Sequence, residues 1–276
     1  MHEYASRVEL PGAPDQPWIV KDETRPAGEV RHLRYESKLL GNERDLWIYT
    51  PPSHGRNQEP AALLLVFDGR AYIDYVPTPT ILDNLSSSAR IPPTVAVLIG
   101  NPSQAARNAE LPPNEAFAGF LAKELIPWIR GRYNVTEDPQ LTIAAGSSFG
   151  CLAAANAALR HSTVFGKILC QSGAFWWAPD HKFRGAENAI TETNWLAKQF
   201  RDSPKLPLSF YLDAGVFEVD TTGSGGVILE PTRHFRDVLL AKGYRVTYQQ
   251  FVGGHDYLSW RNTFAEGLIA LLGVTE

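Results

Sequence analysis

The sequence predicts one doubly wound α/β domain with a mainly parallel sheet and helices on both of its faces. Strand-length apolar runs alternate along the chain with segments of helical spacing. Several of the runs are continuously apolar, as in residues 62–67, which is typical of parallel strands buried on both faces. The chain has 276 residues and no internal repeat, so a single domain with a sizeable core accommodates it.

The elements are expected in the following order. The first 29 residues are polar and contain prolines, and we expect an N-terminal arm there, followed by one catalytic domain over residues 30–276. Residues 30–49 predict two strands around Leu40-Gly41-Asn42. Further strands are expected at 62–67, 93–99, 141–145, 167–171, 208–213 and 246–251. Helices are expected at 116–133, 151–159, 194–200, 233–242 and 257–272, with Pro127 kinking or splitting the first of them.

Composition excludes several classes of function. The formal net charge is −4 and no basic run is present, so nucleic acid and anionic membrane surfaces are not expected partners. No apolar stretch approaches the roughly 20 residues that span a bilayer. The N-terminus lacks a charged segment leading into an apolar run, which favours a cytoplasmic protein; a periplasmic one would require that a signal peptide had been removed.

Metal and disulfide chemistry is not indicated. Cys151 and Cys170 are the two cysteines, and both lie in apolar segments, so we expect two buried free thiols. No CxxC or HxxxH spacing occurs, and we predict neither a metal nor another cofactor. The sequence carries no indication of oligomeric state.

A G-x-S-x-G motif nominates a nucleophile. Gly146-Ser147-Ser148-Phe149-Gly150 follows an expected strand and precedes an expected helix. In that setting a serine lies on a tight strand-to-helix turn with its hydroxyl exposed, and small flanking residues allow close packing around the turn. The motif alone occurs often by chance, so the assignment of Ser148 depends on finding an acid and then a histidine further along the chain.

His255 is the expected general base. It lies in Gly253-Gly254-His255-Asp256, directly after the last strand and before the last helix. The other histidines lie in contexts that suggest no particular role. A base at this position would accept the hydroxyl proton and return it to the leaving group.

The acid is expected in the loop after strand 208–213. That loop offers Asp213, Glu218 and Asp220, and we favour Glu218 because it is far enough into the loop to reach back toward a histidine. Asp213, at the strand end, would instead bond to local backbone groups. The acid would hold the imidazole in one tautomer and stabilise its charged form.

An oxyanion hole requires backbone N–H groups aimed at the developing negative charge. One is expected from Phe149, the residue after the nucleophile. The second would come from Gly69 or Arg70, in the loop after strand 62–67, although Gly69 also fits an ordinary turn.

Four segments together resemble the enterochelin (enterobactin) esterase family, in the esterase-D-like branch of the α/β-hydrolases. Besides the serine motif, these are Arg107-Asn108-Ala109-Glu110-Leu111-Pro112-Pro113-Asn114, Gln171-Ser172-Gly173-Ala174-Phe175-Trp176-Trp177, and Gly253-Gly254-His255-Asp256 followed by Trp260-Arg261. The resemblance covers roughly residues 35–272 and places the acid of the family in the loop that contains Glu218. Ser147 and Cys151 stand where the family more often has Gln and Gly.

The resemblance implies an α/β-hydrolase fold and a serine esterase that opens a catecholate siderophore trilactone, free or as the ferric complex. The substrate would then be a small-molecule ester, and Arg107, Arg70, Trp176 and Trp177 would meet its charge and its aromatic rings. Alternatively, Arg107 pairs with Glu110 and one tryptophan belongs to the core. A feruloyl- or carbohydrate-ester esterase, a non-catalytic siderophore-binding module and an acyltransferase are the alternative functions.

Overall fold

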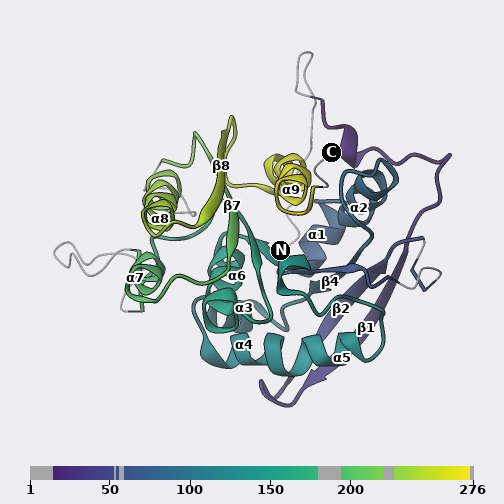
Figure 1. Ribbon diagram of the computed structural model, residues 1–276, viewed down its shortest axis with the longest axis horizontal. Coiled ribbons are helices and arrows are strands. Elements are labelled where there is room, and N and C mark those ends of the chain that lie inside the picture. Colours follow the sequence, from purple (N-terminus) through teal and green to yellow (C-terminus); the bar gives the residue numbers. More distant parts are fainter. Residues whose placement is uncertain (1–14, 53, 56–58, 180–193, 220–226, 274–276) are drawn as a thin grey trace.

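The computed structural model describes residues 15–52, 54–55, 59–179, 194–219 and 227–273. Over these ranges an eight-stranded sheet runs in the order β1-β2-β4-β3-β5-β6-β7-β8 (Figure 1). β1 (Glu29–Ser37) and β2 (Asn42–Thr50) form an antiparallel hairpin, and β2 is antiparallel to β4 (Thr94–Ile99). The remaining pairs are parallel, through β3 (Ala62–Val66), β5 (Thr142–Ser147), β6 (Lys167–Gln171), β7 (Ser209–Gly215) and β8 (Arg245–Phe251). The mainly parallel α/β sheet that the sequence predicts is therefore confirmed.

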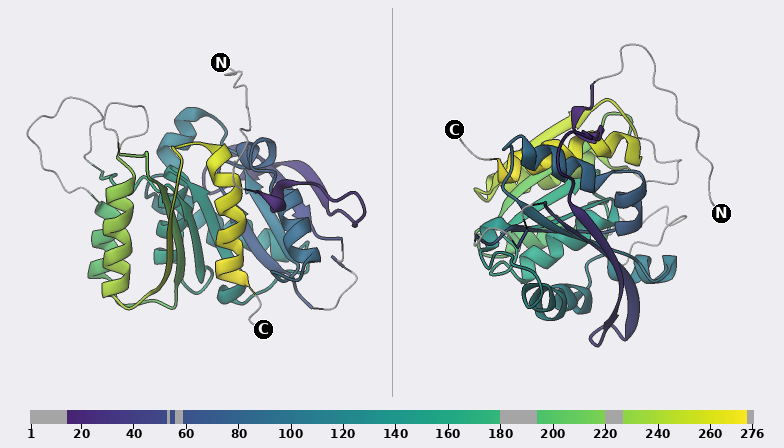
Figure 2. Two further views of the ribbon diagram at one scale, coloured as in Figure 1. Left: turned by 90° about the horizontal axis from the view of Figure 1, so that it is seen from above. Right: turned by 90° about the vertical axis from the view of Figure 1, so that its right-hand side faces the viewer.

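Helices cover both faces of the sheet (Figure 2). One face packs against α1 (Gly69–Asp74), α2 (Thr78–Ser87) and α9 (Tyr257–Leu272). The other packs against α4 (Glu115–Phe120), α5 (Ile126–Arg130), α6 (Phe149–Arg160), α7 (Trp195–Asp202) and α8 (Leu229–Ala241). The central strands are buried on both faces, which explains why they read as continuous apolar runs.

The side chains of β3 show how one strand serves two cores. Leu63 and Leu65 join the core under α4 to α8, whereas Leu64 and Val66 join the core under α1, α2 and α9. This alternation follows from the two-residue period of a strand. It fixes the register of β3 between β4 and β5, because a shift by one residue would exchange the two faces.

The expected helix at 116–133 is divided. α4 ends at Phe120, a π-helical turn covers Leu121–Leu125, and α5 starts at Ile126 with Pro127 in its first turn. Proline lacks an N–H and clashes with the preceding turn, and the wider π turn accommodates both effects. The sequence predicts that Pro127 kinks or splits this helix; the structure shows a π turn directly before α5, with helical backbone on both sides of it.

Three helices were not expected from the sequence. α1 has 6 residues, α3 (Gln104–Glu110) has 7, and α2 has prolines at its start. Short helices like these obtain their stability from packing rather than from their own sequence. The part of the chain described contains no helix long and apolar enough to cross a membrane.

Residues 16–20 contact two helices of the fold. Pro17–Ile19 form a 3₁₀ turn, and the carbonyls of Trp18 and Val20 accept hydrogen bonds from the amide of Asn84 in α2 at 2.9 Å. Gln16 accepts a 2.6 Å bond from Arg261 in α9. This segment therefore contacts α2 and α9, on one face of the sheet.

Candidate active site

Ser148 lies at a strained turn between β5 and α6. Its backbone has φ 54° and ψ −117°, a region that non-glycine residues seldom adopt. The turn is held on both sides, because the N–H of Ser148 donates to the carbonyl of Gln171 at 3.1 Å and its carbonyl accepts from the N–H groups of Cys151 and Ala174. A strained residue that the surrounding backbone holds so firmly fits a presented nucleophile.

Close packing requires glycine at position 146 of the motif. A Cβ on Gly146 would lie 2.9 Å from the backbone of Gly150, and real Cβ atoms do not approach so closely. The thiol of Cys151 lies 3.2 Å from the carbonyl oxygens of both Gly146 and Gln171. Both cysteines are buried and free, as the sequence predicts, and Cys151 ties the turn to the ends of β5 and β6.

His255 and Glu218 contact each other. Nδ1 of His255 lies 2.6 Å from Oε1 of Glu218, and the side chain of Glu218 is 2% exposed while that of His255 is 26% exposed. Glu218 follows β7 and His255 follows β8, so both lie at the carboxyl ends of parallel strands, as Ser148 does at the end of β5. A doubly wound sheet places its ligands outside this edge.

The hydrogen bonds to Glu218 determine the tautomer of His255. Oε2 accepts from the N–H of Gly215 at 2.5 Å and from the hydroxyl of Ser172 at 2.8 Å. With Glu218 as the acceptor, Nδ1 of His255 is the donor in this hydrogen bond, and its proton lies toward Oε1. Nε2 of His255 then has a free lone pair and can act as a base.

Asp213 does not contact His255. It is fully buried, and its Oδ1 accepts from the N–H of Ser172 at 2.9 Å. Burial raises the pKa of Asp213 to about 7, and the hydrogen bond from Ser172 only partly opposes this effect. Asp213 therefore bonds to local backbone, as the sequence suggested, and Asp220 lies outside the described residues.

The candidate oxyanion donors lie at two helix starts. Phe149 opens α6, and Gly69 and Arg70 open α1, where backbone N–H groups have no acceptor within the helix. A Cβ on Gly69 would lie 2.5 Å from the backbone of Leu98, so close packing requires glycine there. The side chain of Arg70 is 72% exposed and pairs with Asp74 at 2.5 Å.

Arg107 pairs with Asp68, the residue before Gly69. Its Nε and Nη2 bond to the two carboxylate oxygens at 2.6 and 2.8 Å, and Asn101 donates to the same carboxylate at 2.6 Å. The alternative expectation that Arg107 pairs with Glu110 is wrong. Glu110 instead bonds to the buried guanidinium of Arg44, in β2, at 3.1 Å.

Trp176 and Trp177 are both partly buried and pack against the core under α6 and α7. The ring of Trp176 lies 6.1 Å from that of Phe149, and Trp177 meets Trp195 edge to face at 5.9 Å. Trp176 is therefore the one in contact with the serine turn. The guanidinium of Arg107 lies 5.7 Å from the centre of the Phe149 ring, which Trp176 also contacts.

Sequence reasoning gave no role to Asp68, Ser172 or Trp260. Each contacts a residue that it did single out: Asp68 pairs with Arg107, while Ser172 bonds to Glu218 and accepts from the indole of Trp260. Ser172 and Trp260 belong to the segments that resemble the esterase family, and this membership was the available signal. Asp68 had none beyond its place before Gly69.

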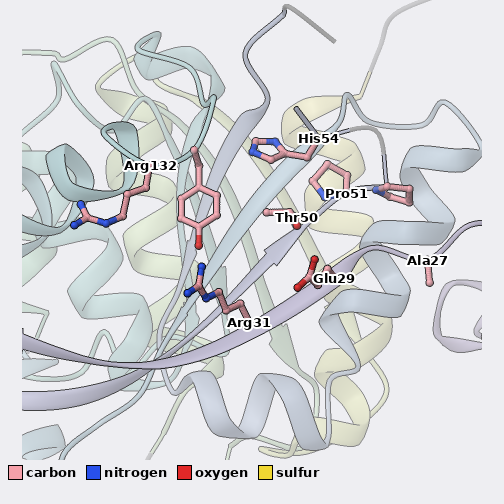
Figure 3. A pocket seen from close by; sticks show the side chains of 9 residues that line it. Ala27, Glu29, Arg31, Thr50, Pro51, His54 and Arg132 are labelled. Carbon is pink, nitrogen blue, oxygen red and sulfur yellow. The ribbon is translucent and has the colours of Figure 1, made fainter. Parts of the chain in front are cut away.

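A groove of about 490 Å³ lies elsewhere on the molecule (Figure 3). Glu29, Arg31 and Thr50 from the β1–β2 hairpin line it, together with His54 and Arg132. Thr50 ends β2, which is antiparallel to β4, so the groove lies toward the amino ends of the parallel strands. It contains none of the candidate catalytic residues. Among the residues described, no cluster of metal-ligating side chains is found.

Comparison with known proteins places the chain among esterases. The family described as "Putative esterase" matches residues 37–271. An iron(III) enterobactin esterase of Dickeya dadantii is 31% identical over 98% of this chain, and one of Escherichia coli K12 is 29% identical over 96%. The chain spans 62% of the length of each of these relatives.

Solved structures show the same fold. The enterochelin esterase of Shigella flexneri superposes with a TM-score of 0.81 at 29% identity, covering 96% of this chain and 63% of that one. A ferulic acid esterase of Anaeromyces mucronatus gives 0.71 at 17% identity, covering 94% of this chain and 96% of that one, which is similarity of fold alone.

Proposed function

Because this chain belongs to the esterase family, we propose that it is a serine esterase that hydrolyses the ester bonds of a catecholate siderophore trilactone. The contact between His255 and Glu218, at the same edge of the sheet as the strained Ser148, is the observation that carries the proposal. The relatives named iron(III) enterobactin esterase support the substrate class.

The chemistry divides among the side chains as follows. Ser148 attacks the ester carbonyl while Nε2 of His255 removes its proton, and the same nitrogen returns the proton to the leaving alcohol. Glu218 holds His255 in the reactive tautomer and stabilises the imidazolium. Water, activated by His255, then attacks the acyl-enzyme and releases the carboxylic acid.

The N–H of Phe149 and that of Gly69 or Arg70 would stabilise the tetrahedral oxyanion. The Asp68–Arg107 pair supports this role for Gly69, because it anchors the residue directly before the first turn of α1. An anionic siderophore would meet Arg107 and Arg70 locally, since the chain as a whole carries a net charge of −4. Trp176 and Trp177 would offer aromatic faces to catechol rings.

The test is to incubate the protein with ferric and iron-free catecholate trilactones and to identify linear products by mass. We expect linear products from the wild type and none above background from Ser148→Ala. Full hydrolysis by Ser148→Ala would contradict the proposed nucleophile. Turnover of a feruloyl sugar ester in preference to the trilactone would retain the serine esterase and replace the substrate.

A further inference from the structure

Ser172 has an unusual backbone for a buried serine. It follows β6, is fully buried, and has φ 48°. Its N–H donates both to the carbonyl of Asp213 at 3.1 Å and to the Asp213 carboxylate at 2.9 Å, which hold this conformation. Glycine would adopt such a backbone without strain, so a serine there suggests that its hydroxyl has a use.

The hydroxyl of Ser172 lies between two partners. The indole Nε1 of Trp260 is 2.9 Å from Oγ, and Oε2 of Glu218 is 2.8 Å from it. An indole N–H can only donate, so Oγ accepts from Trp260. The single hydroxyl proton is thereby directed to Glu218.

These hydrogen bonds hold the Glu218 carboxylate by Oε2, the oxygen that does not face His255. Oε2 is occupied by Ser172 and Gly215, which leaves Oε1 for His255. Trp260 also meets His255 directly, since the two rings are edge to face with centroids 4.9 Å apart. One tryptophan on α9 thus contacts the base and, through Ser172, orients the acid.

We propose that Ser172 and Trp260 are positioning residues for the esterase reaction. They hold Glu218 aimed at Nδ1 of His255, although neither would touch the substrate ester. This inference rests on the proposed function, because it gives the Ser172 hydroxyl its effect only through Glu218 and His255.

The experiment compares Ser172→Gly and Ser172→Ala, with p-nitrophenyl butyrate as the probe. Both changes remove the hydroxyl, but only glycine also relieves the backbone. We expect kcat to fall about tenfold or more in both variants with little change in KM, because a hydrogen bond to a buried charge is lost. Ser172→Cys keeps a weak donor and should recover part of the loss.

Ser37→Ala is the matched control. Ser37 is also buried and donates to a carboxylate, Oε2 of Glu124 at 3.1 Å, but it lies in β1, away from the candidate site. Its kcat should stay within about twofold of the wild type. This comparison separates the loss of a serine–carboxylate hydrogen bond in general from the loss of the bond between Ser172 and Glu218.

The pH profile is a readout that a purely structural serine would not change. A donor to the ionised carboxylate favours the charged form, so removing it makes proton uptake by the His255–Glu218 pair easier. The acid limb of kcat/KM should therefore move to higher pH in Ser172→Gly. Ser37→Ala should leave the limb in place.

A double-mutant cycle tests the role of Trp260. Trp260→Phe keeps an aromatic ring beside His255 and removes the N–H. We expect a smaller loss of kcat than for Ser172→Gly, and little additional loss when the two changes are combined, because they act through the same hydroxyl.

Three results would overturn the inference: wild-type kcat in Ser172→Gly, a loss confined to Ser172→Ala, or fully additive losses in the cycle. Failure of the proposed function would look different. In that case Ser148→Ala would hydrolyse the probe as the wild type does, whatever the Ser172 variants do.

Discussion

Two buried carboxyl groups lie close together at the end of β7, and their surroundings differ. Glu218 has donors on both oxygens: Gly215 and Ser172 on one, and His255 on the other. Asp213 is more deeply buried, bonds to the N–H of Ser172, and has its pKa raised to about 7 by burial. The comparison indicates that the number and direction of donors, rather than position at the strand end, distinguish the candidate catalytic acid.

The largest expected effect distinguishes Glu218 from Asp213 directly. Glu218→Gln should lower kcat about 10³- to 10⁴-fold, because an amide no longer enforces the reactive tautomer of His255. Asp213→Asn should stay within about tenfold, since it keeps an oxygen for the N–H of Ser172. Steady-state kinetics with p-nitrophenyl butyrate measure both. The opposite ranking would move the role of the acid to Asp213.

Asp213 should instead affect stability as pH changes. Its folded pKa of about 7 exceeds the ordinary value of 3.8, so the folded state binds the proton more tightly than the unfolded chain does. The stability of the wild type should therefore fall by about 2 to 3 kcal/mol between pH 5 and pH 8 from this group. Asp213→Asn should remove that fall, as chemical denaturation at the two pH values would show. An equal fall in both proteins would indicate that Asp213 is ionised throughout.

A third carboxylate, Asp68, extends the comparison to an acid paired with a fixed cation. Arg107→Ala would remove both guanidinium bonds from Asp68, which is 6% exposed, while Asn101 would still donate to it. We expect the free energy of unfolding to fall by about 3 kcal/mol, because a buried charge is left without its ion pair. Arg107→Lys should recover part of this free energy of unfolding, because lysine keeps the charge but lacks the bidentate geometry of arginine.

Kinetics on a catecholate trilactone would separate the two proposed roles of Arg107. A rise in KM alone would point to substrate contact, and a fall in kcat alone to the anchoring of α1 before Gly69. Unchanged stability in Arg107→Ala would contradict the importance of the Asp68–Arg107 pair.

The smallest effect is expected at Glu124, a carboxylate with several donors but no histidine. It accepts from the N–H groups of Lys38 and Leu39 and from the hydroxyls of Ser37 and Tyr35. Burial alone would raise the pKa of Glu124, but these bonds lower it below the ordinary value of 4.5. The stabilisation is therefore present above that pH and is lost as pH falls through the folded pKa.

Glu124→Gln should cost about 1 to 2 kcal/mol at pH 7 and progressively less in acid, with kcat unchanged. Thermal unfolding between pH 3 and pH 7 measures the trend. A cost that grows in acid would mean that the bonds to Glu124 favour its protonated form.

The sequence predicted the central strands well because they are buried on both faces. The continuous apolar run at 62–67 predicted a buried parallel strand, and β3 follows this run closely. The short helices α1 and α3 escaped prediction because tertiary packing, rather than local sequence, stabilises them.

The candidate site was less accessible to sequence reasoning where partners are distant. Gly146 to Gly150 identified the turn locally, but the choice among Asp213, Glu218 and Asp220 stayed open, since it depends on how the loop folds back toward β8. The same limit produced the wrong partner for Arg107. Glu110 is its neighbour on α3, whereas Asp68 is distant in the sequence and lies between β3 and α1.

The most direct measurement is peptide mass mapping after reaction with a fluorophosphonate, which labels activated serines. We predict one adduct per chain, on Ser148, and greatly slowed labelling in Glu218→Gln, where His255 loses its orienting carboxylate. Adducts on another serine, or equally rapid labelling in Glu218→Gln, would contradict the assignment of Ser148, His255 and Glu218 as a working unit.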